Sequence, residues 1–213
     1  MTDEKLISLI RQVEAKGIAS ERVLNAMLSI DRAKFVPEQY RHSAYIDSPL
    51  PIGSGQTISQ PYIVAYMTEQ LGICPEDRVL EVGAGSGYQL AILTELSRNV
   101  YSIEKRKRLI AIAQKNLLEA GCSIPPIKAG DGYEGWEDHA PFDKIIVTAA
   151  ATHIPPPLVS QLGSGGRMVI PVGGRDEVQR LLLVLKDENG AVATRSLESV
   201  RFVPMVGKAQ KKK

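Results

Sequence analysis

Three glycines at alternate positions, Gly83, Gly85 and Gly87, mark the stretch of this sequence best suited to hold a ligand. An aliphatic run typical of a buried strand precedes them at 79–82, and an apolar helical pattern follows at 90–96. Glycines let a ligand lie against bare backbone, and the start of the helix offers N–H groups nearby. Strand, glycine turn and helix in this order are typical of a nucleotide-binding α/β fold, although a plain tight turn would contain the same glycines.

Two glutamates near this turn bear on the identity of the ligand. Glu81 precedes the first glycine, and Glu104 ends a second predicted strand about 20 residues after the glycines, the distance expected of an acid that binds ribose. The third glycine comes one residue earlier than in the dinucleotide fingerprint G-x-G-x-x-G. The combined pattern resembles the S-adenosylmethionine site of Rossmann-like methyltransferases.

Two further polar residues have both a structural and a chemical interpretation. Asp131 lies between two glycines after the third predicted strand, where it can form a turn or hydrogen-bond an adenine amino group. Ser59 lies shortly before Pro61, which favours the first turn of a helix, so Ser59 or Gln60 can cap that helix. A capped helix start is also an anion site, so the two roles of Ser59 are compatible.

The histidines and cysteines indicate no metal centre. His42, His139 and His153 share no metal-ligand spacing and belong to no visible catalytic triad, so we expect ordinary loop or surface histidines. Cys74 and Cys122 are distant single residues, and we expect them to be buried thiols in a reducing cytosol.

Length and composition favour one α/β domain. The chain has 213 residues, of which 44% are hydrophobic and 23% charged, with a net charge of +2. This balance favours neither a nucleic-acid groove nor a membrane surface. No apolar run approaches the roughly 20 residues that span a bilayer, and the polar start does not resemble a signal peptide. We therefore expect a cytoplasmic protein.

Periodicity divides the chain into an N-terminal extension (1–60), a Rossmann-like core (61–205) and a short basic tail (206–213) that we expect to be a solvated end. The extension contains two helices, one at 3–16 and one that starts with Ser20 as its N-cap. An irregular stretch follows at 35–58, which we expect to be a functional loop. The predicted fold is a mostly parallel, seven-stranded, doubly wound sheet. Its strands are expected at 79–82, 100–103, 124–128, 142–147, 167–172, 179–186 and 200–205, and its helices from Pro61 and at 90–96, 105–119 and 155–162.

Five segments, in order, resemble the protein-L-isoaspartate (D-aspartate) O-methyltransferase family. They are Gln56-Thr-Ile-Ser59, Leu80-Glu-Val-Gly-Ala-Gly-Ser-Gly-Tyr88, Gly130-Asp-Gly132, Pro141-Phe-Asp-Lys-Ile-Ile-Val-Thr-Ala-Ala150 and Gln161-Leu-Gly-Ser-Gly-Gly-Arg-Met-Val-Ile-Pro-Val-Gly173. The glycine motif is shared by many methyltransferases, whereas the Thr-Ile-Ser-x-Pro segment is more specific. The family commonly has Ala-Pro-His after the serine, where this sequence has Gln60-Pro61-Tyr62.

The resemblance implies methyl transfer from S-adenosylmethionine to the free carboxyl of L-isoaspartyl, and some D-aspartyl, residues in damaged proteins and peptides. The methyl ester then closes to a succinimide, whose hydrolysis returns part of the material to normal aspartate. The resemblance further implies a monomer that needs no metal. Because a carboxylate is already a nucleophile at pH 7, this reaction requires no general base.

The resemblance also assigns roles to individual residues. It makes Ser59 the active-site residue, which orients the attacking carboxylate with help from Thr57 and from backbone groups around Ile58. Ile58 and Ser59 would also contact the cofactor. In the donor site, Glu104 would bind the ribose, and Glu81 would arrange the methionine end directly or through water. Val203 in the segment 201–204 would line the peptide groove. The turn residues Gly83, Gly85, Ser86 and Gly87 would hold the methionine part, and Asp131 with Gly132 would read the adenine.

Two other functions remain open at the level of sequence. A methyltransferase of the same fold could act on RNA or on a small molecule, although the near-neutral charge and the lack of an Asn/Asp-Pro-Pro-aromatic motif disfavour this. A nucleotide-binding module or NAD(P) oxidoreductase would need the glycine spacing that this chain lacks.

Overall fold

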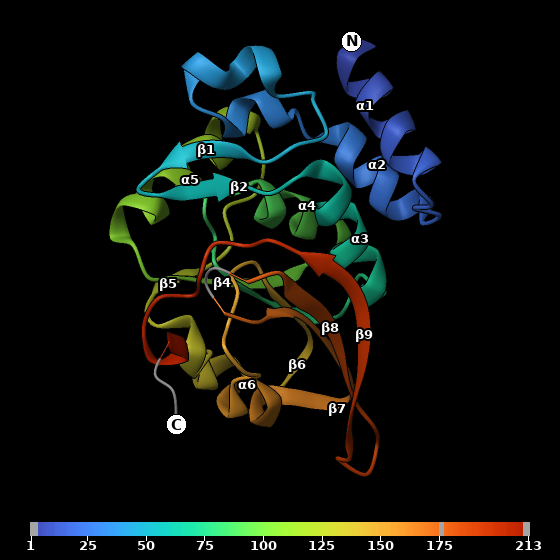
Figure 1. Ribbon diagram of the computed structural model, residues 1–213, viewed down its shortest axis with the longest axis vertical. Helices are drawn as coiled ribbons and strands as arrows, with labels where there is room; N and C mark the ends of the chain where they lie inside the picture. The colour runs from blue at the N-terminus through green and yellow to red at the C-terminus, as the bar shows by residue number, and fades with distance from the viewer. Residues whose placement is uncertain (1–3, 175–176, 211–213) are drawn as a thin grey trace.

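A seven-stranded sheet with helices on both faces forms the centre of the molecule in the computed structural model, which describes residues 4–174 and 177–210 (Figure 1). The strand order is β5-β4-β3-β6-β7-β8-β9. Strands β3 to β7 run parallel, and β8 is antiparallel to both of its neighbours. Its strands are β3 (Arg78–Val82), β4 (Asn99–Glu104), β5 (Ile127–Ala129), β6 (Phe142–Val147), β7 (Leu162–Val172), β8 (Gln179–Lys186) and β9 (Val192–Val200). The predicted mostly parallel, doubly wound fold is confirmed.

Helices α3 and α4 lie on one face of this sheet and α6 on the other (Figure 1). The α-helices are α1 (Glu4–Ala15), α2 (Glu21–Ser29), α3 (Pro61–Leu71), α4 (Tyr88–Leu96), α5 (Lys107–Ala120) and α6 (Pro156–Gln161). The predicted N-cap of α2 is confirmed, since the Ser20 side chain accepts the Val23 N–H. No helix in the described ranges is long and apolar enough to cross a membrane.

The stretch expected to be irregular, 35–58, contains more structure than predicted. Short 3₁₀ helices at Arg32–Phe35 and Glu38–Ser43 lead into an antiparallel hairpin of β1 (Leu50–Gly53) and β2 (Gln56–Ile58). This hairpin lies above the edge of the large sheet in Figure 1. Its strands have only four and three residues, too few to show a period of two in the sequence.

The last strand was predicted in the wrong place. The apolar run at 200–205 is not a sheet strand; the seventh strand is β9, which ends at Val200. Most of β9 is exposed, so its sequence alternates weakly between apolar and polar residues. The run after it instead crosses the carboxyl end of the sheet, where the backbone of Ala150 exchanges hydrogen bonds with Val203 and Met205.

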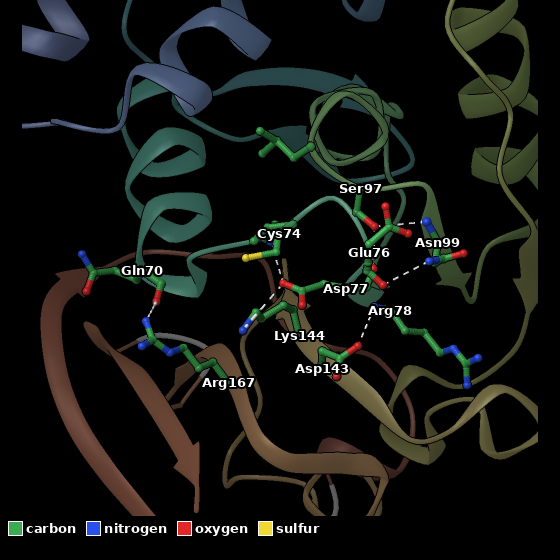
Figure 2. A network of polar contacts seen from close by, with 12 residues as sticks. Gln70, Cys74, Glu76, Asp77, Arg78, Ser97, Asn99, Asp143, Lys144 and Arg167 are labelled. Carbon is green, nitrogen blue, oxygen red and sulfur yellow. Dashed lines mark hydrogen bonds and ion pairs between the residues drawn. The ribbon is translucent and has the colours of Figure 1, made fainter.

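The two ends of the parallel strands differ in character. At the amino end, the loops are joined by polar contacts: Asp143 accepts the Arg78 N–H at 2.7 Å and Asp77 lies 3.7 Å from the Lys144 ammonium (Figure 2). Cys74, predicted to be buried, is exposed in this network because it precedes the turn in which Asp77 accepts its N–H. At the carboxyl end the strands open into a cleft.

Candidate active site

The cleft lies at the carboxyl ends of β3, β4 and β6. The connections from β3 and from β6 leave in opposite directions along the sheet, so the cleft is at the topological switch point, where open α/β sheets bind ligands. The hairpin closes it from one side and the C-terminal segment 203–206 from another. Its lining comprises Gln56, Thr57, Ile58, Ser59, Val64, Val82, Gly83, Ala84, Gly85, Ser86, Tyr88, Gln89, Ile103, Glu104, Lys105, Arg106, Leu109, Gly132, Thr148, Ala149, Val203, Pro204, Met205 and Val206.

Most of the predicted site residues line this one cleft, although they come from five separate parts of the sequence. The members of the predicted set that do so are Thr57, Ile58, Ser59, Gly83, Gly85, Ser86, Glu104, Gly132 and Val203. Glu81, Gly87 and Asp131 are not among the lining residues.

Glu104 is the carboxylate of the cleft, at the end of β4. Its two oxygens accept the Gly85 N–H at 3.1 Å and the Arg106 N–H at 2.8 Å, so the side chain is fixed against the glycine turn. It is 7% exposed. Each carboxylate oxygen has further acceptor capacity, so Glu104 fits the role of binding ribose hydroxyl groups.

Glu81 lies beneath the glycine turn and is fully buried. Ser102 donates to one of its oxygens at 2.6 Å, and the other oxygen has no partner among the described residues. Burial raises the pKa of Glu81 to about 8, opposed by the Ser102 hydrogen bond and reinforced by the charge of Glu104. A direct contact of Glu81 with a donor molecule remains a prediction.

Gly87 begins α4 with a left-handed backbone, φ 89°. A Cβ at this position would lie 3.2 Å from the carbonyl oxygen of Ala113 in α5. The third glycine therefore allows α4 and α5 to pack closely, and this packing requirement explains it without a ligand.

Asp131 contacts the chain just after the segment 203–206, at Lys208. One of its oxygens accepts from the Lys105 ammonium at 3.0 Å and from the Lys208 N–H at 3.1 Å, while the other accepts the Tyr133 N–H. Burial opposes ionisation, but the bonds from Lys105 and from backbone N–H groups outweigh it and lower the pKa of Asp131. Both sequence interpretations of Asp131 stay open, since it forms a turn and its neighbour Gly132 lines the cleft.

Ser59 follows β2 and precedes α3. The prediction that the side chain of Ser59 or Gln60 caps α3 is wrong. Instead Asp47, from the preceding loop, accepts the Tyr62 N–H at 2.8 Å. Because the cap comes from elsewhere, the Ser59 hydroxyl has no hydrogen-bond partner in the part of the chain that the structure describes.

A second groove adjoins the cleft on the far side of Ser59. It runs between the start of α3 and the segment 199–203, and it shares Thr57, Ser59, Thr148 and Val203 with the cleft. Ser59 therefore lines both hollows, at the side where a ligand in the cleft and a second ligand in the groove would adjoin.

The two residues that depart from the common family pattern hold the rim of this groove. Gln60 donates to the carbonyl and carboxylate oxygens of Asp47, at 3.1 and 3.0 Å. The Tyr62 hydroxyl donates to Glu198 of β9 at 2.6 Å. These two residues therefore join the start of α3 to the loop at Asp47 and to β9.

Sequence reasoning missed several residues that shape the site. The bond from Arg32 to the carbonyl of Ser59, the cap from Asp47 and the ion pair between Lys105 and Asp131 were not predicted. Each joins segments distant in sequence, and no local pattern marks such residues. No group of three histidine, cysteine or acidic side chains arranged for a metal ion occurs in residues 4–174 and 177–210.

The fold and the cleft define a Rossmann-like methyltransferase of the kind that uses S-adenosylmethionine. The family model described as Protein-L-isoaspartate(D-aspartate) O-methyltransferase matches residues 4–210, and this chain belongs to that family.

Relatives in sequence and in structure agree with this assignment. A protein of Syntrophobacter fumaroxidans named protein-L-isoaspartate O-methyltransferase 2 is 56% identical over 90% of this chain and 78% of its own length. A protein of the same name from a Polaromonas species is 50% identical over 96% and 98%. A Plasmodium falciparum structure described as a protein-L-isoaspartate O-methyltransferase in complex with S-adenosyl-L-homocysteine superposes with a TM-score of 0.81, at 29% identity over 93% of this chain and 97% of the other.

Proposed function

We propose that this protein transfers the methyl group of S-adenosylmethionine to the free α-carboxyl group of L-isoaspartyl residues, and of some D-aspartyl residues, in damaged proteins and peptides. The observation that carries the proposal is that Ser59 lines two adjoining hollows, one at the switch point of the sheet and one between the start of α3 and the segment 199–203. Two relatives are named for this activity, and the Plasmodium falciparum structure holds S-adenosyl-L-homocysteine, the product that such a transfer leaves.

The residues of the cleft fit the donor. The fixed carboxylate of Glu104 suits the ribose, and Gly85 next to it has a left-handed backbone without a side chain between turn and cleft. When bound, S-adenosylmethionine supplies a methyl group activated by its positively charged sulfur. Gly132 and the segment 203–206 would enclose the remaining part of the donor.

The protein contributes mainly by positioning the reacting groups, and acid–base chemistry is not required of it. The α-carboxyl of an isoaspartyl residue has a reference pKa near 4 and is ionised at pH 7, so no general base has to remove a proton. The Ser59 hydroxyl can donate to that carboxylate and hold one oxygen toward the cleft, and Thr57 lies beside it. Holding the reacting groups in line can contribute on the order of 7–11 kcal/mol.

The adjoining groove suits a peptide of variable sequence. It is lined in part by the segment 199–203, whose backbone groups would bind a peptide without reading its side chains. On this proposal the ester leaves the enzyme and closes to a succinimide without further catalysis. The partners are isoaspartyl proteins and peptides, and we place the enzyme in the cytoplasm as a monomer that needs neither nucleic acid nor membrane.

The test compares two synthetic peptides that differ only in whether one residue is L-isoaspartyl or normal L-aspartyl. Labelled methyl transfer from S-adenosylmethionine should occur to the isoaspartyl peptide and not to its twin. Transfer to a tRNA in place of the peptide would support the alternative, a methyltransferase of RNA. Equal transfer to both peptides, or none to either, would refute the proposal.

A further inference from the structure

A fully buried arginine lies behind the segment that carries Ser59. Arg32 begins the first 3₁₀ helix and is 0% exposed. It forms no ion pair within the described ranges, and the neighbouring Asp31 accepts the Ala33 N–H and the Tyr45 hydroxyl. Burial lowers the pKa of Arg32, but a guanidinium stays charged at neutral pH. An unpaired buried charge is costly, so its hydrogen bonds must compensate for the lost water.

The Arg32 guanidinium makes these hydrogen bonds to three backbone carbonyls. It donates to Ala44 at 2.6 Å, to Ser48 at 3.0 Å and to Ser59 at 3.1 Å. The acceptors lie 12, 16 and 27 residues away in the sequence, at the start, within and at the end of the segment that contains the hairpin. One rigid planar group therefore fixes the path of this segment at both ends.

The position of the Ser59 hydroxyl depends on this backbone. Its side chain has no hydrogen-bond partner among the described residues, so no side-chain bond holds it in place, and the course of the main chain sets where Ser59 stands between cleft and groove. After Ser59 the chain is fixed by the Asp47 cap on α3. At Ser59 itself it is fixed by Arg32.

We infer that Arg32 is a positioning residue, which acts through the carbonyl of Ser59 to aim the Ser59 hydroxyl at the methyl-accepting carboxylate; this inference rests on the proposed function. Lysine cannot replace it. An ammonium is a single point of charge on a flexible stem and cannot present a planar fork to three separated carbonyls.

The test compares Arg32→Lys with Arg22→Lys. Arg22 is a matched control because its guanidinium also donates to two backbone carbonyls, those of Ile73 at 2.6 Å and Leu96 at 3.1 Å, and it lines neither the cleft nor the groove. Both variants keep the charge and lose the fork. Arg32→Met is the second variant, which removes the buried charge in case an ammonium prevents folding at this position.

We expect kcat for the isoaspartyl peptide to fall by about 10- to 100-fold in Arg32→Lys and Arg32→Met, because small misplacements of reacting groups are costly. The affinity for S-adenosylhomocysteine, measured by calorimetry, should not change. Arg22→Lys should keep the wild-type kcat. Amide hydrogen exchange at 56–60 should become faster in the Arg32 variants than in wild type or Arg22→Lys.

Two outcomes would overturn the inference. One is a folded Arg32 variant with wild-type kcat and unchanged exchange at 56–60. The other is an equal loss of kcat in Arg22→Lys, which would mean that the effect is one of general stability. If the wild-type protein methylates no isoaspartyl peptide, the proposed function fails, and the exchange measurement alone then decides whether Arg32 holds the Ser59 segment.

Discussion

The Ser59 hydroxyl contributes to neither the cap of α3 nor any other hydrogen bond of the described chain, so its removal should affect chemistry more than folding. Ser59→Ala should lower kcat for the isoaspartyl peptide by about 10- to 100-fold, since a hydrogen bond to a charged partner is worth about 1.5–3 kcal/mol. The urea unfolding midpoint should stay at its wild-type value. Full activity in Ser59→Ala would show that another group orients the carboxylate, and Ser160→Ala, on the outer side of α6, serves as the control.

Glu81 should make stability depend on pH in the ligand-free protein. Burial raises its pKa to about 8 in the folded state, whereas an unfolded chain has the ordinary glutamate value near 4.5. Between these values the folded state holds a proton that the unfolded state has lost, so the free energy of unfolding falls as the pH rises. The contribution of Glu81 is thus present below about pH 4.5 and lost as the pH passes through about 8.

Glu81→Gln should remove this dependence. Between pH 6 and pH 9 the wild type should lose on the order of 2 kcal/mol more of its unfolding free energy than the variant does. Urea unfolding at both pH values measures this difference. Glu76→Gln, at a side chain that is 74% exposed, should keep the wild-type dependence, and the explanation fails if Glu81→Gln keeps it too.

At the scale of elements, the buried strands were predicted correctly from the sequence and the exposed strand was not. The central strands β3 and β6 are apolar runs and were predicted within a residue of their true bounds, because both faces of such strands must be hydrophobic. The exposed edge strand β9 has no such requirement and was missed. The third strand was expected at 124–128 and is β5, and the fifth begins earlier than expected because three glycines extend it.

The site was predictable where one element carries several of its residues. The glycine turn and Glu104 follow from the order of strand, turn and helix, and Ser59 came from the resemblance. Arg32 and Asp47 act across long sequence separations, and nothing near Arg32 in the sequence shows that its charge is buried. Only the packed chain shows such residues to be part of the site.

The contact between α4 and α5 should depend on the absence of a side chain at Gly87. In Gly87→Ala the new Cβ would lie against the Ala113 backbone, and alanine would also be strained in the left-handed conformation at this position. The two effects together should cost about 2–4 kcal/mol of unfolding free energy. Gly121→Ala is the control, since φ is 73° there but nothing lies within 4 Å of the added Cβ, and it should cost about 1 kcal/mol. Equal losses in the two variants, measured by urea unfolding, would remove the packing explanation for Gly87.

At the scale of the whole molecule, two segments far apart in the sequence close the cleft from different sides. The hairpin belongs to the N-terminal part, while the segment 203–206 comes after the last strand (Figure 1). The tail was expected to be a solvated end from 206 onward, but its described part is anchored: Lys208 N–H donates to Asp131, and Ala209 is buried. Residues 211–213 lie outside the described ranges.

This anchoring predicts that a change at Ala209, which does not line the cleft, should weaken donor binding. Ala209 and Met205 both belong to the buried apolar cluster that contains Phe142 and Leu158, and the Ala209 carbonyl accepts from the Thr152 hydroxyl at 2.6 Å. A carboxylate in Ala209→Asp cannot stay buried there without a partner, and a chain end can separate locally while the sheet stays folded.

The affinity for S-adenosylhomocysteine should therefore fall about tenfold in Ala209→Asp, the loss of roughly one well-made hydrogen bond, with a small change in the unfolding midpoint. Ala193→Asp introduces the same charge on the exposed strand β9 and should leave the affinity unchanged. Calorimetry separates the two. If both variants bind S-adenosylhomocysteine like the wild type, the segment 203–206 lines the cleft without contributing to binding. If both bind it weakly, the added charge and not the loss of anchoring causes the effect, because Ala193 does not anchor the segment.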